Sequence, residues 1–227
     1  MDFPERHTWD LDYAQARALQ ETLARQVDVE SKVGRWETVA AADVSYNKYD
    51  PRLYAAVIVA DATTGAVVER VGAVSEAKFP YIPGLLSFRE APAVLDAFRK
   101  VKTRPDVVIC DGQGYAHPRR LGLACHLGLW LGVPTLGCAK SRLTGRYVEP
   151  GPRRGDRSPL VDGGETIGAV LRTRDRVSPL FVSAGHLCDL ESAVAVVLGC
   201  TTKYRLPDVS REAHNHVNEL RRQGGLG

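Results

Sequence analysis

The chain has 227 residues, which is enough for one domain with a sizeable core. Its hydrophobic content of 44% and charged content of 25% are ordinary for a globular protein, and a formal net charge of +3 excludes a strongly acidic or basic chain. No apolar run is long enough to span a membrane, and residues 1–7 lack the features of a signal peptide. We therefore expect one cytoplasmic domain over residues 1–227.

The first part of the chain predicts a helix followed by three strands. An apolar stripe predicts a helix from Asp10 to about Val27. Residues 37–46, 53–60 and 66–74 predict strands, the last two joined by a hairpin turn. Asp43 lies among small apolar residues of the first strand. Since a lone carboxylate is costly to bury unless it is paired or binds a metal, Asp43 is a candidate functional residue.

Two prolines, Pro80 and Pro83, stiffen the segment that follows the third strand. Such a loop can hold Tyr81 and Ile82 outward as a wedge, or it can be a turn with an aromatic lid over the core. The next helix is predicted to begin near Ser87. Ser87 and Glu90 match a capping box, which is a purely structural alternative for Glu90.

The middle of the chain predicts a β-α-β unit. Residues 107–110 are all apolar, as in a strand buried on both faces, and residues 119–131 and 132–137 predict a helix and a second strand. Open α/β sheets bind ligands at the carboxyl ends of their strands. Asp111 lies at one such end and Lys140 lies just past the other, so both are candidate site residues.

The last part of the chain begins with a basic segment, residues 140–157, which is either a solvated loop or a contact for phosphates. Residues 166–172 and 180–183 then predict a hairpin. Asp189 is the expected N-cap of a helix over residues 190–198. Ser210 is the expected N-cap of a final helix, and His214 lies at the edge of the apolar stripe of that helix.

Three carboxylates, Asp43, Glu90 and Asp111, thus lie at the edges of predicted elements. Clustered carboxylate oxygens suit Mg²⁺ or Mn²⁺ better than Zn²⁺. Paired divalent ions about 3.5–4 Å apart promote in-line displacement at phosphorus, and Lys140 could neutralise the phosphate or orient a water. This order of elements predicts a ribonuclease H-like nuclease, although other α/β folds match it.

Other chemistries are disfavoured. Cys125 and His126 are adjacent in a predicted helix, where consecutive side chains point apart, so they do not form a nucleophile and base. The cysteines and histidines have no zinc-site spacing, and neither a dinucleotide fingerprint nor a P-loop is present. The five cysteines are scattered, and we expect buried thiols and not disulfides.

Taken together, these motifs resemble the endonuclease V family, in its bacterial form. The resemblance covers about residues 15–222. The matching segments are Ala42–Ser45, Pro80–Gly84 with Phe88–Glu90, Asp111–Gly122, Gly137–Ser141, Val182–His186, and Arg205–Pro207 with Arg211 and His214.

The resemblance implies an α/β fold with a ribonuclease H-like mixed five-stranded central sheet, flanked by helices and extended by a C-terminal hairpin and helices. It implies Mg²⁺ as cofactor, with Mn²⁺ as a substitute. By similarity Asp43 and Asp111 bind the metal with Glu90 as a third acidic member. Lys140 and His214 assist at the phosphate or water.

The resemblance also implies a substrate. Enzymes of this family recognise hypoxanthine in deoxyinosine and cut the second phosphodiester bond on its 3′ side, leaving 3′-hydroxyl and 5′-phosphate ends. We expect a monomer that binds DNA containing deoxyinosine, or inosine-containing RNA, and no membrane. Alternatives are a non-catalytic binder of deaminated or branched nucleic acid, and an inosine-RNA or junction nuclease on the same fold. The expected wedge and substrate-binding residues are Pro80, Tyr81, Ile82, Pro83, Gly84, Leu86, Gly112 and His117.

Overall fold

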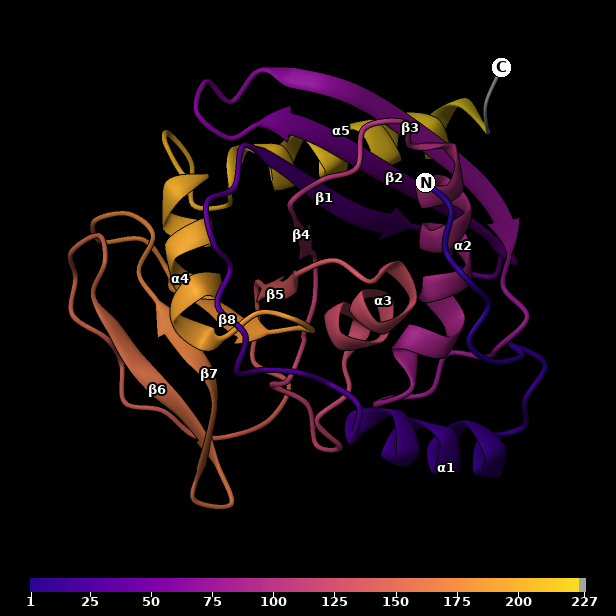
Figure 1. Cartoon of the computed structure of the whole chain (residues 1–227), viewed down its shortest axis with the longest axis horizontal. Helices are drawn as coiled ribbons and strands as arrows, with labels where there is room; N and C mark the ends of the chain where they lie inside the picture. Colours follow the sequence, from indigo (N-terminus) through magenta and orange to yellow (C-terminus); the bar gives the residue numbers. More distant parts are fainter. Residues whose placement is uncertain (225–227) are drawn as a thin grey trace.

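The computed structural model describes residues 1–224, which form one mixed sheet of eight strands and five helices (Figure 1). The strands are β1 (Thr38–Ser45), β2 (Arg52–Asp61), β3 (Val67–Glu76), β4 (Val107–Cys110), β5 (Thr135–Ala139), β6 (Arg157–Asp162), β7 (Glu165–Leu171) and β8 (Leu180–Ala184). The helices are α1 (Tyr13–Ala24), α2 (Leu86–Lys100), α3 (Leu123–Leu131), α4 (Leu190–Gly199) and α5 (Asp208–Gln223).

The strand order is β3-β2-β1-β4-β5-β8-β7-β6. β1 pairs antiparallel with β2 and parallel with β4, and β4 pairs parallel with β5. The predicted ribonuclease H-like α/β fold is thereby confirmed. The predicted late hairpin is present as β7 and β8, and it extends the central sheet. β8 pairs with β5, so the five central strands continue as one sheet out to β6, at the end of Figure 1 farthest from β3.

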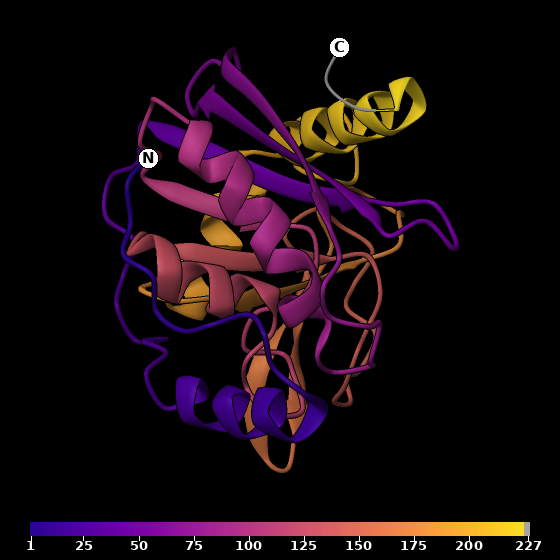
Figure 2. The same cartoon turned by 90° about the vertical axis from the view of Figure 1, so that its right-hand side faces the viewer.

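Helices cover both faces of the sheet, and the alternation of side chains along each strand decides which face a residue meets. In β1, Ala40 and Ala42 pack in the same core cluster as residues of α2 and α3, whereas Val39 and Ala41 pack with residues of α4 and α5. Figure 2 shows α2 and α5 separated by the strands. The result is a three-layer α/β/α arrangement.

Helix starts differ from several predictions. α1 begins at Tyr13 and not at Asp10, because Asp12 is its N-cap, in a capping box with Gln15. α3 begins at Leu123, since the residues after Arg119 form a loop. The sequence therefore predicted the first residues of α1 and α3 only to within a few positions.

Two predicted caps are wrong. α2 begins at Leu86, so Ser87 lies inside the helix, and its hydroxyl pairs with Nδ1 of His126 at 3.0 Å instead of capping the helix. α5 begins at Asp208, directly after Pro207, so Ser210 also lies inside its helix. Glu90 consequently has no capping role in this structure.

Buried thiols were predicted correctly, since all five cysteines are buried and free. Among residues 1–224, no helix combines the length and the apolar character needed to cross a membrane. The acidic residues of the sheet therefore remain the candidate functional residues.

Candidate active site

Asp43 and Asp111 lie side by side at one edge of the sheet. Ala42 and Cys110 are partners in the parallel ladder of β1 and β4, and the residue that follows each of them is an aspartate. The Asp111 amide donates a hydrogen bond to the carbonyl of Ala42 at 3.2 Å. Side chains alternate between the two faces of a strand, so both aspartates lie on the face of the sheet that α4 and α5 cover. The predicted convergence of these two carboxylates is present.

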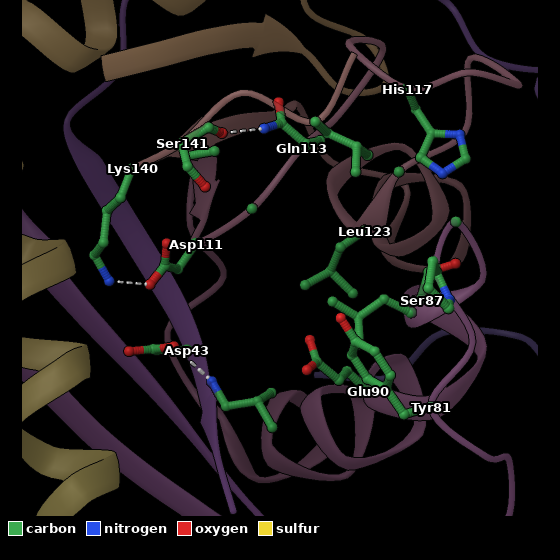
Figure 3. Close-up of a pocket in the computed structure, with 18 of the residues that line it drawn as sticks. Asp43, Tyr81, Ser87, Glu90, Asp111, Gln113, His117, Leu123, Lys140 and Ser141 are labelled. Atoms are coloured by element: carbon green, nitrogen blue, oxygen red, sulfur yellow. Dashed lines mark hydrogen bonds and ion pairs between the residues drawn. The ribbon is translucent and has the colours of Figure 1, made fainter. Parts of the chain in front are cut away.

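Lys140 and His214 each contact one of the two aspartates. Nζ of Lys140, just beyond the end of β5, lies 2.6 Å from Oδ2 of Asp111. Nδ1 of His214, on α5, lies 2.8 Å from Oδ2 of Asp43. Figure 3 shows Asp43, Asp111 and Lys140 on one side of a cavity, with Glu90 and Tyr81 across from them. The four predicted residues of this side therefore form one cluster.

The carboxyl groups carry more negative charge than the site compensates. Burial raises the pKa of Asp43, and the charge of Asp111 raises it further. Glu90, on α2, is 8% exposed. Burial raises the pKa of Glu90 to about 8, with further contributions from Asp43 and Asp111, while Arg89 opposes the shift. A cation at this site would relieve both effects.

The donor set fits a hard divalent cation. One ligand atom each from Asp43, Asp111 and His214 lie within 4.8 Å of one another. Two carboxylates supply the oxygen atoms that Mg²⁺ and Mn²⁺ prefer, and a bound cation would favour the ionised forms that burial and the neighbouring carboxylates disfavour at Asp43 and Glu90. Glu90 lies outside that tight group, so its role as a third acidic member stays a prediction.

A cavity of about 620 Å³ adjoins the carboxylates. Tyr81 lies at its rim and is 61% exposed. Ile82 instead packs against the buried cluster of Phe79, Leu85 and Phe88, and it anchors the loop from which Tyr81 projects. Pro80 is exposed and does not line the cavity. The other expected substrate-binding residues that line the cavity are Pro83, Gly84, Leu86, Gly112 and His117.

The wall of the cavity near Gly84 is held rigidly. The Gly84 carbonyl accepts hydrogen bonds from Nη2 of Arg119 at 2.7 Å and from Nε2 of Gln20 at 3.0 Å. Gly84 has φ +79°, and a Cβ there would lie 2.9 Å from Arg119. Burial, with a smaller contribution from Arg119, lowers the pKa of the neighbouring His117 to about 4, so this imidazole is neutral at pH 7.

Several lining residues were not predicted from the sequence. Most of them lie within three positions of a predicted site residue. Extending each predicted motif by three residues on either side would have included these. The unpredicted lining residues are Val44, Ser45, Tyr46, Ser87, Gln113, Leu121, Gly122, Leu123, Ala139, Ser141, Arg142 and Leu143. Of the basic residues in the predicted basic segment, residues 140–157, Lys140 and Arg142 line the cavity.

The sheet order and the acidic edge, with a lysine at the end of a neighbouring strand, define a ribonuclease H-like nuclease. Comparison with known proteins gives the particular family. A sequence model of endonuclease V matches residues 21–215. The curated endonuclease V of Geotalea uraniireducens is 49% identical over 93% of this chain and 90% of its own. The chain therefore belongs to the endonuclease V family.

Solved structures agree with this assignment. The endonuclease V of Streptomyces avermitilis superposes with a TM-score of 0.92 at 41% identity, covering 95% of this chain and 96% of its own. The endonuclease V of Ciona intestinalis superposes with a TM-score of 0.81 at 25% identity, covering 92% of this chain and 97% of its own. The Ciona structure is a complex with a 23mer DNA that contains an inosine followed by a ribo-adenosine.

Proposed function

We propose that this chain is a single catalytic domain that acts in DNA repair as a deoxyinosine endonuclease. It hydrolyses the second phosphodiester bond 3′ to deoxyinosine and leaves 3′-hydroxyl and 5′-phosphate ends. The observation that carries the proposal is the cavity of about 620 Å³ that opens directly beside the carboxylates of Asp43 and Asp111. Recognition of a base and cleavage of a phosphodiester thus share one site. Membership of the endonuclease V family supports this reading.

The acidic edge supplies the hydrolytic chemistry. Asp43 and Asp111, with Glu90 across the cavity, would hold Mg²⁺ or, in its place, Mn²⁺. When bound, such an ion stabilises developing negative charge and lowers the pKa of a water. Lys140 is held next to the phosphate position by its ion pair with Asp111, where its ammonium offsets phosphate charge. His214 contributes through its hydrogen bond to Asp43.

The cavity supplies recognition. A base extruded from the helix would enter between the segments of Gly84 and Gly112, and neutral His117 lines the same wall. Extrusion costs less for a weakened pair than for a sound one, which favours a deaminated base. Tyr81 at the rim would stack in the gap left by that base, and such stacking contributes roughly 1–3 kcal/mol per base. The stiff loop around Tyr81 lowers the entropic cost of that contact.

The test is a cleavage assay on end-labelled oligonucleotides with one inosine, as duplex DNA, single-stranded DNA and single-stranded RNA. Adenine in place of inosine is the matched control, and each substrate is run with Mg²⁺, with Mn²⁺ and with EDTA. We expect a metal-dependent cut at the second linkage 3′ to inosine. Inosine-selective retention in a gel shift without any cutting would identify a non-catalytic binder instead. Preferential cutting of RNA would favour the inosine-RNA nuclease.

The protein is proposed to act as a monomer in the cytoplasm. Sedimentation velocity of the free protein and of its complex with an inosine duplex measures the stoichiometry. A complex with two protein chains per lesion would refute the monomer.

A further inference from the structure

The imidazole of His214 is held between two side chains, Asp43 on one side and Asn218 on the other. Nδ2 of Asn218, one helical turn further along α5, lies 3.2 Å from Nε2 of His214 and 2.8 Å from the His214 carbonyl oxygen. Oδ1 of Asn218 lies 3.1 Å from Oγ of Ser45 and 3.3 Å from Nη2 of Arg221. A chain of hydrogen bonds thus runs from Arg221 to Asp43.

The orientation of the Asn218 amide is determined by its neighbours. The Arg221 guanidinium can only donate, so it must face the amide oxygen. The His214 carbonyl can only accept, so it must face the amide nitrogen. Turning the amide over would oppose donor to donor and acceptor to acceptor at these two contacts. In the observed orientation both hydrogens and both acceptor positions of Asn218 are used.

This orientation fixes the proton on His214. Nε2 of His214 faces an N–H donor of Asn218 and must therefore accept, which leaves the proton of the neutral ring on Nδ1. Nδ1 then donates to Oδ2 of Asp43 at 2.8 Å. Both ring nitrogens are occupied, one by Asp43 and one by Asn218. In this arrangement His214 acts through Asp43, and of the three groups that lie within 4.8 Å of one another the two aspartates remain to bind a cation.

Both oxygens of Asp43 are consequently held from the protein side. Oδ1 of Asp43 accepts a hydrogen bond from the Val44 amide at 2.8 Å, and Oδ2 accepts the one from His214. A carboxylate oxygen has a second acceptor position, so each oxygen can still bind a cation. The hydrogen bonds orient a ligand before the cation arrives, as partners of metal ligands do.

We propose that Asn218 is a positioning residue that selects the Nδ1–H form of His214 and thereby orients Asp43 toward the metal. This inference rests on the proposed function for the metal site, but not on the identity of the substrate. The matched control is Asn215→Ala, because Asn215 is an exposed residue of the same type on the same helix.

The first experiment measures the proton position directly. Two-bond ¹H–¹⁵N correlation spectra of the metal-free protein, at about pH 8 where an ordinary histidine is neutral, distinguish Nδ1–H from Nε2–H. His214→Gln assigns the resonance. We expect Nδ1–H alone in the wild type and in Asn215→Ala. We expect protons on both Nδ1 and Nε2 in Asn218→Asp, because that variant places an acceptor on each side of the ring. Nε2–H in the wild-type protein would overturn the proposal.

The second experiment measures Mn²⁺ binding by electron paramagnetic resonance, without substrate. Asn218→Ala should bind Mn²⁺ about tenfold more weakly than the wild type, as expected for the loss of a residue that orients a metal ligand, and Asn215→Ala should not. Equal affinity in all three proteins, or an equal loss in both variants, would refute the positioning role. Because neither readout involves DNA, failure to cut inosine would refute the proposed function and leave this result standing.

Discussion

Asp43 and Asp111 are brought together by a single hydrogen-bonded step of the parallel ladder, in which the Asp111 amide donates to the carbonyl of Ala42 at 3.2 Å. Their carboxyl groups therefore lie on one face of the sheet, and the charge of Asp111 raises the pKa of Asp43, which burial already raises. This arrangement costs stability in the metal-free protein and creates the site that the cation needs. The first two predictions follow from this opposition between stability of the metal-free protein and binding of the cation.

Asp43→Asn and Asp111→Asn should each abolish inosine cleavage while leaving the protein folded. An amide keeps the shape of the side chain but removes the charge that a hard cation requires. The measurements are the cleavage assay and circular dichroism of both variants. Glu76→Gln, at the exposed end of β3, is the control and should cleave normally. Full activity in either aspartate variant would refute the metal assignment.

Glu90 should make the metal-free protein less stable as the pH rises. The pKa of Glu90 is raised from 4.5 to about 8 in the folded protein. The folded state therefore binds this proton more tightly than the unfolded state, and stability present below about pH 4.5 is lost as the pH rises toward 8. Glu90→Gln has no proton to lose and should be the more stable protein at about pH 9, by a few kcal/mol.

Thermal unfolding in EDTA from about pH 5 to about pH 9 tests this prediction. Since about 1 kcal/mol corresponds to roughly 2–4 °C for a chain of this size, the two melting temperatures should separate by several degrees at the alkaline end. Parallel curves for Glu90→Gln and the wild type would show that the carboxyl ionises normally. Addition of Mg²⁺ should narrow the gap, because a bound cation favours the ionised carboxylates.

Tyr81→Ala should weaken binding of inosine-containing duplex more than it slows cleavage of bound substrate. Loss of one stacking contact worth roughly 1–3 kcal/mol corresponds to an increase in Kd of about fivefold to 150-fold. Fluorescence anisotropy and single-turnover cleavage separate the two effects. Tyr13→Ala, an exposed tyrosine on α1, is the control. A fall in the single-turnover rate with unchanged Kd would place Tyr81 in the chemical step instead.

The sequence was sufficient to predict the acidic edge, because the β-α-β unit determines where strand ends meet. The apolar run before Asp111 and the apolar residues around Asp43 mark buried strands, and parallel neighbours bring their carboxyl ends together. Local periodicity carries that information. The eight-stranded extent of the sheet is less visible, since the burial of β6 does not alternate and only Leu160 in it is buried.

Contacts between distant segments could not be predicted in the same way. Ser87 and Glu90 have the spacing of a capping box, but the Ser87 hydroxyl is bonded to His126, which lies 39 residues away. His214 and Asn218 are one turn apart on a helix, which local rules recognise. The position of this pair next to Asp43 depends on how α5 packs across β1. No local sequence pattern specifies that packing.

The last prediction concerns the residues that attach the N-terminal segment to α2 and α3. Nε2 of His7 lies 2.8 Å from Nε2 of His126 and accepts a hydrogen bond from Nε1 of Trp130 at 3.1 Å. Nδ1 of His7 faces the carbonyl of Thr8 and must donate, so Nε2 of His126 is the donor to His7. Nδ1 of His126 then accepts from Ser87. Both rings are neutral in this network.

Acidification should therefore destabilise the protein through His126. Burial, with a smaller contribution from His7, lowers the pKa of His126 from 6.5 to about 3. Between these values the unfolded state binds the proton and the folded state does not, so stability is lost as the pH falls through this window. At about pH 5 the loss through His126 should be roughly 2 kcal/mol, and His126→Gln should remove this contribution and leave that of His117, whose pKa is also lowered by burial.

Urea unfolding at about pH 7 and about pH 5 measures the difference for the wild type and for each variant. His216→Gln is the control, because the pKa of His216 is also lowered by burial but its side chain is much less enclosed. This control should retain most of the wild-type acid sensitivity. If His126→Gln lost as much stability on acidification as the wild type, the protonation of His126 could not be its cause, and His117, whose pKa burial lowers to about 4, would be the next group to test.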